Sequence, residues 1–456
     1  MVAKKISLFS LILLIVAAID SIRNLPSSAI FGSSLIFFFL LAAVVFLIPV
    51  SLISAYFSSS FPSEGGIYYW IKTAFGEKWG VVAIWLQWIN TMVWYPTVLS
   101  FIAATSSYLV DPSLASNSHY LVVVIISVLW ILTLVNLKGI HFSLKINNIC
   151  AILGTVLPLF LLIILGLSFL FTNEVIYVSF TPKDLIPDLR RLDEWTSLVA
   201  IMASFLGMEL AGVHVNDIAN PQKNFPKAIL IASFFILITM LGGSLSIAFI
   251  LPSEEIHLVA GVMQAFDKTP LKFLTPLMTL FIVLGTMGGM TNWLISPAKG
   301  LMQAAEYGFL PQIMKKKNKN GVASYLLITQ AVLISIFTFC FLFHPSVNQF
   351  YWFLTALSTQ LYMCMYILMF LGALYLHKKN QTKNTFQLPG KTPGFFSICG
   401  LGILGCLITI VVSFIPPSHL RVESYGTYLS VIGLGNLLSL SPLVFLFWYK
   451  KKYSRS

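Results

Sequence analysis

Apolar runs of about 20 residues, the length that a helix needs to cross a bilayer of about 30 Å, recur along the whole chain. The short alternation of apolar and polar residues that is typical of membrane β-barrels is not found. Composition agrees, because 57% of the 456 residues are hydrophobic and only 10% are charged. Soluble domains carry about 25% charged residues. We therefore expect an all-α integral membrane protein.

We predict about twelve membrane-spanning helices. They lie near residues 6–30, 34–57, 79–110, 119–137, 146–171, 205–228, 229–251, 271–297, 322–343, 350–376, 395–415 and 429–449. The stretch 61–76 is too polar to span a membrane and too aromatic for a free loop. It is expected to form a re-entrant or interfacial helix on the cytoplasmic side, with Tyr68, Tyr69 and Trp70 at the membrane boundary.

The first predicted span is interrupted by the sequence DSIRNLPSSAIFG at residues 20–32. A charged side chain at the bilayer centre is unfavourable by about 2.5–3.5 kcal/mol, so Asp20 and Arg23 must face protein or water. Pro26 lacks an amide hydrogen and clashes with the preceding turn, which predicts an interruption over residues 21–26. Unpaired backbone groups at mid-membrane are typical of transporter binding sites.

A second interruption is predicted in the sixth span, where Gly207 and Gly212 flank Glu209. Each glycine weakens a helix by about 1 kcal/mol, and the carboxylate adds a further cost. The two interruptions lie five spans apart, which predicts an inverted repeat of residues 6–172 and 195–377 with the site between the two breaks. Extra helices over 395–449 complete one transmembrane domain, 1–449, and a basic tail follows at 450–456.

The net charge of +12 is interpreted as a topology signal and not as a nucleic-acid site. If every second loop is cytoplasmic, beginning with the N-terminus, most of the lysines and arginines lie inside and most of the acids outside. This places both termini in the cytoplasm of a multi-pass protein, and we expect a bacterial inner (plasma) membrane and no cleavable signal peptide. Five cysteines, Cys150, Cys340, Cys364, Cys399 and Cys406, lie in apolar runs without metal spacing and are expected to be free, buried thiols.

Several side chains in the spans are candidates for binding or coupling. Arg23 can bind an anionic substrate group, or it can pair with Asp20 three residues earlier, and both interpretations stay open. Glu209, held away from water at a helix break, can take up and release a proton, or it can donate a hydrogen bond to unpaired carbonyls. His214 is either a pH sensor or an ordinary histidine. Mid-span aromatic residues that line or gate a cavity, or only pack, are Trp94, Tyr95, Trp293, Tyr362 and Tyr366.

An ordered set of motifs carries a family resemblance. It comprises PSEGGIYYWIKTAFGEKWG from Pro62, GMELAGVHVNDIANPQKNFPKA from Gly207, EEIHLVAGVMQAF from Glu254, NWLISPAKGL from Asn292, KNKNGV from Lys317, TFQLPG from Thr385 and SFIPP from Ser413. With these motifs the chain resembles the amino acid, polyamine and organocation (APC) transporter superfamily, closest to the bacterial glutamate/gamma-aminobutyrate antiporter group. The motifs cover nearly the whole chain.

The resemblance implies twelve helices, an inner bundle of spans one, two, six and seven that rocks against a scaffold, and exchange of one amino acid for another or for its decarboxylated amine. It places the substrate carboxylate at amide hydrogens of the first break and the amino group at carbonyls of both breaks. Helix ends of opposite partial charge favour the same arrangement. The implied substrate-binding residues are Ile22, Arg23, Asn24, Pro26, Ser27, Ser28, Gly207, Met208, Glu209, Ala211 and Gly212.

This chain departs from the antiporter group at three places. Arg23 and Asn24 replace a tyrosine and a glutamate, Gly289 replaces a glutamate in span eight, and the tail is too short for a C-terminal plug. The substrate and the acid gating therefore stay open. A proton-coupled amino acid or polyamine symporter with Glu209 as the proton carrier is the first alternative, and a non-transporting nutrient sensor is the second. We expect an amino acid substrate, lipid surroundings, no enzyme activity and no cofactor or metal, and the sequence indicates no oligomeric state.

Overall fold

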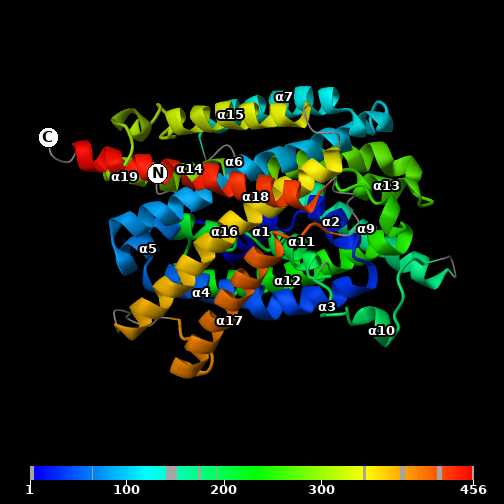
Figure 1. Cartoon of the computed structure of the whole chain (residues 1–456), viewed down its shortest axis with the longest axis horizontal. Helices are drawn as coiled ribbons and strands as arrows, with labels where there is room; N and C mark the ends of the chain where they lie inside the picture. The colour runs from blue at the N-terminus through cyan, green and yellow to red at the C-terminus, as the bar shows by residue number, and fades with distance from the viewer. Residues whose placement is uncertain are drawn as a thin grey trace.

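The computed structural model describes residues 5–63, 65–139, 150, 152–172, 176–192, 194–342, 346–379, 386–417 and 424–453. Helices make up nearly all of the ordered elements in these residues, and an isolated bridge between Ile6 and Ile218 is the only β-type pairing that they contain. The N- and C-termini lie at the same end of the molecule (Figure 1). The prediction of an all-α fold is therefore confirmed.

The helices are α1 (Leu8–Ile19), α2 (Leu25–Ala29), α3 (Leu35–Ala42), α4 (Ile48–Ser60), α5 (Gly66–Phe75), α6 (Glu77–Ser107), α7 (Ser118–Asn136), α9 (Leu157–Phe171), α10 (Pro182–Leu185), α11 (Thr196–Ala203), α12 (Pro221–Ile250), α13 (Gly261–Asp267), α14 (Thr275–Glu306), α15 (Ser324–Thr338), α16 (Val347–Lys378), α17 (Lys391–Val412), α18 (Tyr425–Leu440) and α19 (Pro442–Tyr453). Short 3-10 segments precede α2 (η1, Ile22–Asn24) and follow α11 (η6, Leu210–Asp217). Two π-helical turns, Ala43–Leu47 and Ile152–Val156, lead into α4 and α9.

Within the described residues, ten helical segments are long and apolar enough to cross a membrane. They correspond to ten of the twelve predicted spans. The third predicted span forms α6, which has 31 residues, but Gln87 and Asn90 lower its hydropathy. The sixth is divided between α11 and η6. The chain is a multi-pass membrane protein, and the count of twelve stays a prediction.

The first interruption lies slightly earlier than the sequence predicts. Helix α1 ends at Ile19, Ser21 is extended, and α2 already begins at Leu25. Pro26 lies in the first turn of α2, where backbone amide hydrogens have no acceptor within the helix. The proline therefore fits the start of α2 and is not the cause of the end of α1. The prediction of an interruption over residues 21–26 was therefore wrong at its C-terminal end.

The second interruption lies between Ala203, the last residue of α11, and Leu210, the first residue of η6. Gly207 has a φ of +105°, which residues with a side chain rarely adopt. The two interruptions are neighbours, because α1 packs against η6 and α11 packs against η1 and α2. The site predicted between the breaks therefore has a definite place in the fold.

The helices form two groups around this place. Helix α12 packs against α1, α2, α4 and α9, whereas α6 packs against α5, α7, α14 and α16. Helices α7 and α15 lie side by side along one edge of the molecule (Figure 1). The contacts of α12 with α1, α2 and α4 agree with an inner bundle that contains spans one, two and seven, whereas α9, which belongs to span five, packs on α12 from outside that bundle. The division into a bundle and a scaffold stays a prediction.

Three helix ends differ from the prediction. Helix α14 continues past Pro297 to Glu306, because neighbouring groups in a packed membrane bundle can satisfy the carbonyl that a proline leaves free. Helix α12 begins at Pro221, since proline fits the first turn. Pro442 begins a new helix and divides the last predicted span into α18 and α19.

One burial prediction was wrong, and the position of α5 at the membrane boundary stays a prediction. Tyr68 and Trp70 of α5 are buried in protein, because α5 packs on α6 and α16 and Trp70 stacks on Phe57, while Tyr69 is 37% exposed. Among the cysteines only Cys399 and Cys406 are buried, while Cys340 is exposed and the others are intermediate. Apolar runs in a membrane protein face lipid as well as protein, so an apolar neighbourhood does not establish burial.

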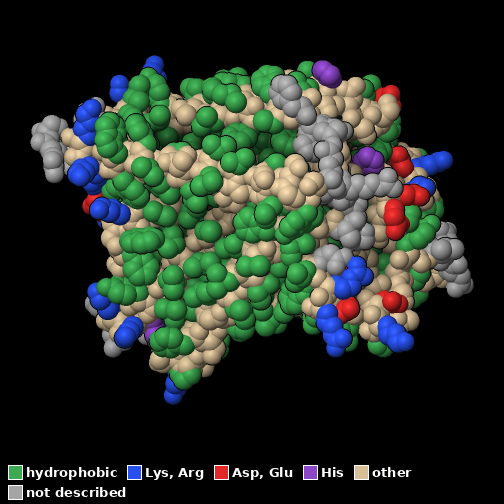
Figure 2. Space-filling model, in the orientation of Figure 1, with side chains coloured by type: hydrophobic (Ala, Val, Ile, Leu, Met, Phe, Trp, Pro, Cys, Tyr) green, Lys and Arg blue, Asp and Glu red, His purple; other side chains and the backbone are tan. Residues whose placement is uncertain are grey.

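Charged side chains separate to the two ends of the molecule. In the face shown in Figure 2, lysines and arginines predominate at the end that holds α5 and α19, whereas most acidic side chains lie at the opposite end, near α10 and α13. A broad apolar belt lies between them. A separation of charge between the two ends is expected from the sequence, and which end faces the cytoplasm stays a prediction.

Candidate functional site

Arg23 lies in the first break and is only 3% exposed. Its Nη1 donates hydrogen bonds to Thr97 Oγ1 of α6 at 3.0 Å and to Tyr351 Oη of α16 at 3.1 Å. Its Cζ lies 4.9 Å from the ring centre of Trp94. Among the described residues no acid pairs with Arg23, and its buried Nε has no hydrogen-bond partner. The first break therefore contains a buried cation whose Nε–H is free to donate a hydrogen bond.

Asp20 does not form the ion pair with Arg23 that its spacing allowed. Its Oδ2 instead accepts a hydrogen bond from Thr239 Oγ1 of α12 at 2.8 Å. Its Oδ1 is buried and, within the described part of the chain, has no hydrogen-bond partner. The two charged residues thus contact different helices. Asp20 binds α12, whereas Arg23 binds α6 and α16.

Glu209 is the last residue of the second break, directly before η6, and is 1% exposed. Three donors surround its carboxylate: Tyr362 Oη at 2.5 Å, Tyr366 Oη at 2.5 Å and Gln87 Nε2 at 2.7 Å. The backbone N–H of Gly207 donates to Tyr366 Oη at 2.9 Å, which leaves the tyrosine proton for Glu209. Each donor fits an ionised carboxylate, which accepts only. The second break is thereby fixed to α6 and α16.

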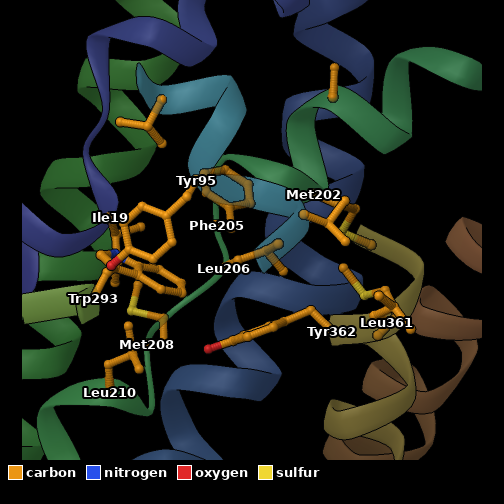
Figure 3. Packing of buried hydrophobic residues seen from close by; sticks show 14 of the residues in the cluster. Ile19, Tyr95, Met202, Phe205, Leu206, Met208, Leu210, Trp293, Leu361 and Tyr362 are labelled. Atoms are coloured by element: carbon orange, nitrogen blue, oxygen red, sulfur yellow. The ribbon is translucent and has the colours of Figure 1, made fainter. Parts of the chain in front are cut away.

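Aromatic rings connect the two breaks. The ring centres of Trp94 and Trp293 are 4.6 Å apart, those of Trp293 and Tyr362 5.9 Å, and those of Tyr362 and Tyr366 5.2 Å. Trp293 Nε1 also donates to the carbonyl of Ala18 at 2.7 Å, near the end of α1. The interrupted backbone with Phe205, Leu206 and Met208 runs close to these rings (Figure 3).

Tyr95 completes the predicted aromatic set. Its ring centre lies 5.5 Å from that of Trp94, and its hydroxyl donates to the carbonyl of Met290 at 3.4 Å. Figure 3 places it beside Trp293 and Ile19. All five predicted aromatic residues therefore lie around the two breaks, although they are separated widely in the sequence.

A narrow cavity lies beside the first break, between α1, α6 and α14. It is lined by Ala17, Asp20, Trp94, Thr286 and Trp293, among others, and has a volume of about 30 Å³. This is enough for one or two water molecules and too small for an amino acid. Trp293 forms part of the wall of this cavity.

The remaining predicted residues belong to the backbone of the two breaks. Ile22, Asn24, Pro26, Ser27 and Ser28 are buried, and Ser27 Oγ donates to the carbonyl of Asn24 at 2.8 Å.

Around the second break, Met208 and Ala211 are buried, and a Cβ on Gly212 would lie 2.8 Å from Trp70. The side chain of His214 lies outside the described residues. A Cβ on Gly289 would lie 2.8 Å from the carbonyl oxygen of Ala17. A side chain at this departure from the antiporter group would therefore clash with the end of α1.

Four partners of the buried charges were missed by sequence reasoning: Gln87, Thr97, Thr239 and Tyr351. A helical-wheel signal exists for one of them. Tyr351 lies eleven residues before Tyr362, which is close to three helical turns, so both tyrosines occupy the same face of α16. Thr239 offers no such signal.

Replacing Gly207 by alanine is expected to reduce transport about 100-fold, because the left-handed backbone disfavours any side chain by about 1–2 kcal/mol and the Cβ would lie 2.7 Å from Trp293 Cζ2. The rate is measured as substrate uptake into vesicles, with protein amount and thermal stability measured in parallel. Gly400→Ala is the matched control, because no heavy atom lies within 4 Å of that added Cβ. Wild-type transport by Gly207→Ala would show that the bend at the second break is not required.

Comparison with known proteins finds similar membrane transporters. An uncharacterized transporter of Legionella pneumophila is 36% identical over 426 residues, which cover 92% of each chain. The glutamate/gamma-aminobutyrate antiporter of Lactococcus lactis is 29% identical over 442 residues, which cover 94% of this chain and 87% of the relative. A probable agmatine/putrescine antiporter of the same species is 24% identical over 420 residues, covering 91% and 88%.

The amino acid permease family matches this chain over residues 6–437. The match covers both breaks, the aromatic set between them and every charged group described above. The resemblance that the sequence motifs carried is confirmed: the chain belongs to the amino acid permease family of membrane transporters.

Proposed function

We propose that the protein exchanges amino acids across the bacterial inner membrane by alternating access around the two helix breaks. The bundle of α1–α4, α11, η6 and α12 moves against the scaffold of α6, α7 and α14–α16. Twelve spans in two inverted repeats, 6–172 and 195–377, support this motion, with α17–α19 outside the repeats and both termini in the cytoplasm. The basic end of the molecule in Figure 2 is then the cytoplasmic end.

Arg23 is the observation that carries the proposal for the substrate. A buried guanidinium with an unused Nε–H and no acidic partner among the described residues favours a ligand that brings a carboxylate. It disfavours a dicationic amine, since agmatine or putrescine would add like charge beside Arg23. We therefore favour a glutamate/gamma-aminobutyrate type of exchange over an agmatine/putrescine type.

Substrate binding requires a rearrangement of Trp293. The cavity beside the first break is too small for an amino acid, and the Trp293 indole covers the carbonyl of Ala18 that a substrate ammonium group would reach. A shift of this ring would open the space between Arg23 and Glu209. The ring therefore acts as the inner wall of an occluded site in this proposal.

Counterflow in proteoliposomes tests the exchange. Vesicles are loaded with glutamate, gamma-aminobutyrate, arginine or agmatine, and uptake of each labelled compound is measured with and without internal substrate. We expect uptake only into loaded vesicles, and faster uptake for compounds that carry a carboxylate and no surplus positive charge. Exchange of agmatine without exchange of any acidic or zwitterionic compound would overturn the choice of substrate.

Proton-coupled uptake is the second candidate function, and Asp20 favours it. One oxygen of this buried carboxylate has no partner in the described residues and lies beside a cavity that can hold water, so it can take up a proton. Uptake that continues without internal substrate and collapses with the proton gradient would support this function and exclude strict exchange.

Under this second function, Asp20→Asn is expected to reduce the stimulation by a proton gradient at least about tenfold, because an amide cannot carry the proton. Counterflow in the same vesicles separates loss of coupling from loss of binding. The matched control is Asp267→Asn, where an exposed carboxylate accepts a similar hydrogen bond from Thr275 at 2.9 Å. Unchanged stimulation in Asp20→Asn would remove Asp20 from the proton path.

A further inference from the structure

A second hollow, far from the helix breaks, lies where the C-terminal helix α19 meets the start of α6. It has a volume of about 880 Å³, and Lys78, Trp79, Phe309, Phe447, Trp448 and Lys451 line it. Helices α5 and α19 lie at the same end of the molecule, where lysines and arginines predominate (Figures 1 and 2). The hollow is large enough for the headgroup and upper chain of a lipid.

The acidic group in this hollow is already neutralised. Lys450 Nζ lies 2.7 Å from the Glu77 carboxylate, donates to the carbonyl of Tyr307 at 2.9 Å and sits 4.1 Å from the ring centre of Phe309. This contact clamps α19 onto α6 and the end of α14. Glu77 is the only acid among the described lining residues, and it is paired with Lys450. Lys78 and Lys451 are therefore cations without an acidic partner in the lining. The hollow is therefore complementary to a negative charge.

The other lining side chains point to a lipid and not to a free anion. Trp79 is 50% exposed and directly follows Lys78, and Trp448 is 52% exposed and lies three residues before Lys451. Tryptophan and lysine together are typical of the level at which lipid headgroups meet water. The span Tyr425–Lys452, which comprises α18 and nearly all of α19, is also only 17% buried in protein, the lowest share among the ten spans of the described chain. Its inner end consequently lies where lipid surrounds the protein.

We propose that this hollow binds an anionic phospholipid, with Lys78 and Lys451 on the phosphate and Trp79 and Trp448 against the glycerol and upper acyl chains. Basic pockets at the ends of membrane helices are suited to such headgroups. The bound lipid would hold α19 against α6 next to the Lys450–Glu77 contact. The proposal does not depend on which amino acid is transported.

Native mass spectrometry of the full-length purified protein tests the site, with phosphatidylglycerol and phosphatidylcholine as the probes. We expect phosphatidylglycerol to bind more tightly, and Lys78→Gln with Lys451→Gln to weaken that binding roughly thirtyfold. Lys183→Gln with Lys268→Gln, two exposed lysines at the opposite end, is the matched control and is expected to bind as the wild type does. Lys78→Arg with Lys451→Arg should retain binding.

Three results would overturn the proposal. The first is equal binding of phosphatidylglycerol by the wild type and the Lys78→Gln, Lys451→Gln variant. The second is equal binding of phosphatidylglycerol and phosphatidylcholine by the wild type. The third is displacement of phosphatidylglycerol by inorganic phosphate alone, which would make the hollow a site for a soluble anion.

Discussion

Replacing Arg23 by glutamine is expected to lower counterflow of acidic amino acids about thirtyfold. A charged hydrogen bond contributes about 1.5–3 kcal/mol, and 1.4 kcal/mol corresponds to a factor of ten. Glutamine can still donate to Thr97 or Tyr351, but it cannot supply the positive charge or the contact over Trp94. The measurement is the initial rate of counterflow at several substrate concentrations.

The concentration dependence separates two roles of Arg23. If the guanidinium binds a substrate carboxylate, Arg23→Gln raises KM for acidic substrates more than for neutral ones. If Arg23 only links the first break to α6 and α16, the maximal rate changes for every substrate alike. Tyr351→Phe is the control, because it removes one hydroxyl partner and keeps the charge, and its expected loss is only about threefold to tenfold. Unaltered acidic-substrate transport by Arg23→Gln would remove the binding role.

The positions of the two breaks were predictable because their causes are local. Charges inside an apolar run and glycines beside a carboxylate are visible at residues 20–32 and 207–212. Gly207 adopts a backbone conformation that favours glycine, so the glycine in the sequence is required by the bend that it predicts. The fold class and the place of the site followed from these two stretches together with the apolar periodicity.

The partners of the buried charges were not predictable, because they depend on how distant helices rotate. Arg23 meets Tyr351 across 328 positions of sequence, and Glu209 meets Gln87 across 122. The alternative of an Asp20–Arg23 pair assumed that a helical turn continues between them. Ser21, with φ −107° and ψ 109°, is extended instead, so residues three apart no longer share a face.

Replacing Glu209 by glutamine is expected to reduce transport about 100-fold. Three donors converge on this carboxylate, and hydrogen bonds to a buried charge contribute about 1.5–3 kcal/mol each. Glutamine has one acceptor oxygen, so its amide nitrogen must face either the hydroxyl of Tyr366 or the donors of Tyr362 and Gln87. The bend at the second break thereby loses part of its attachment to α16.

Titration of transport against pH distinguishes a proton carrier from a structural carboxylate at Glu209. If Glu209 takes up a proton in the cycle, the wild-type rate varies with pH and the residual rate of Glu209→Gln does not. Tyr362→Phe is the control, because it removes a single donor and leaves the carboxylate, so its expected loss is about tenfold with the pH profile retained. A Glu209→Gln variant that keeps the wild-type pH profile carries its proton elsewhere, and Asp20, with its unpaired oxygen, is then the group to test.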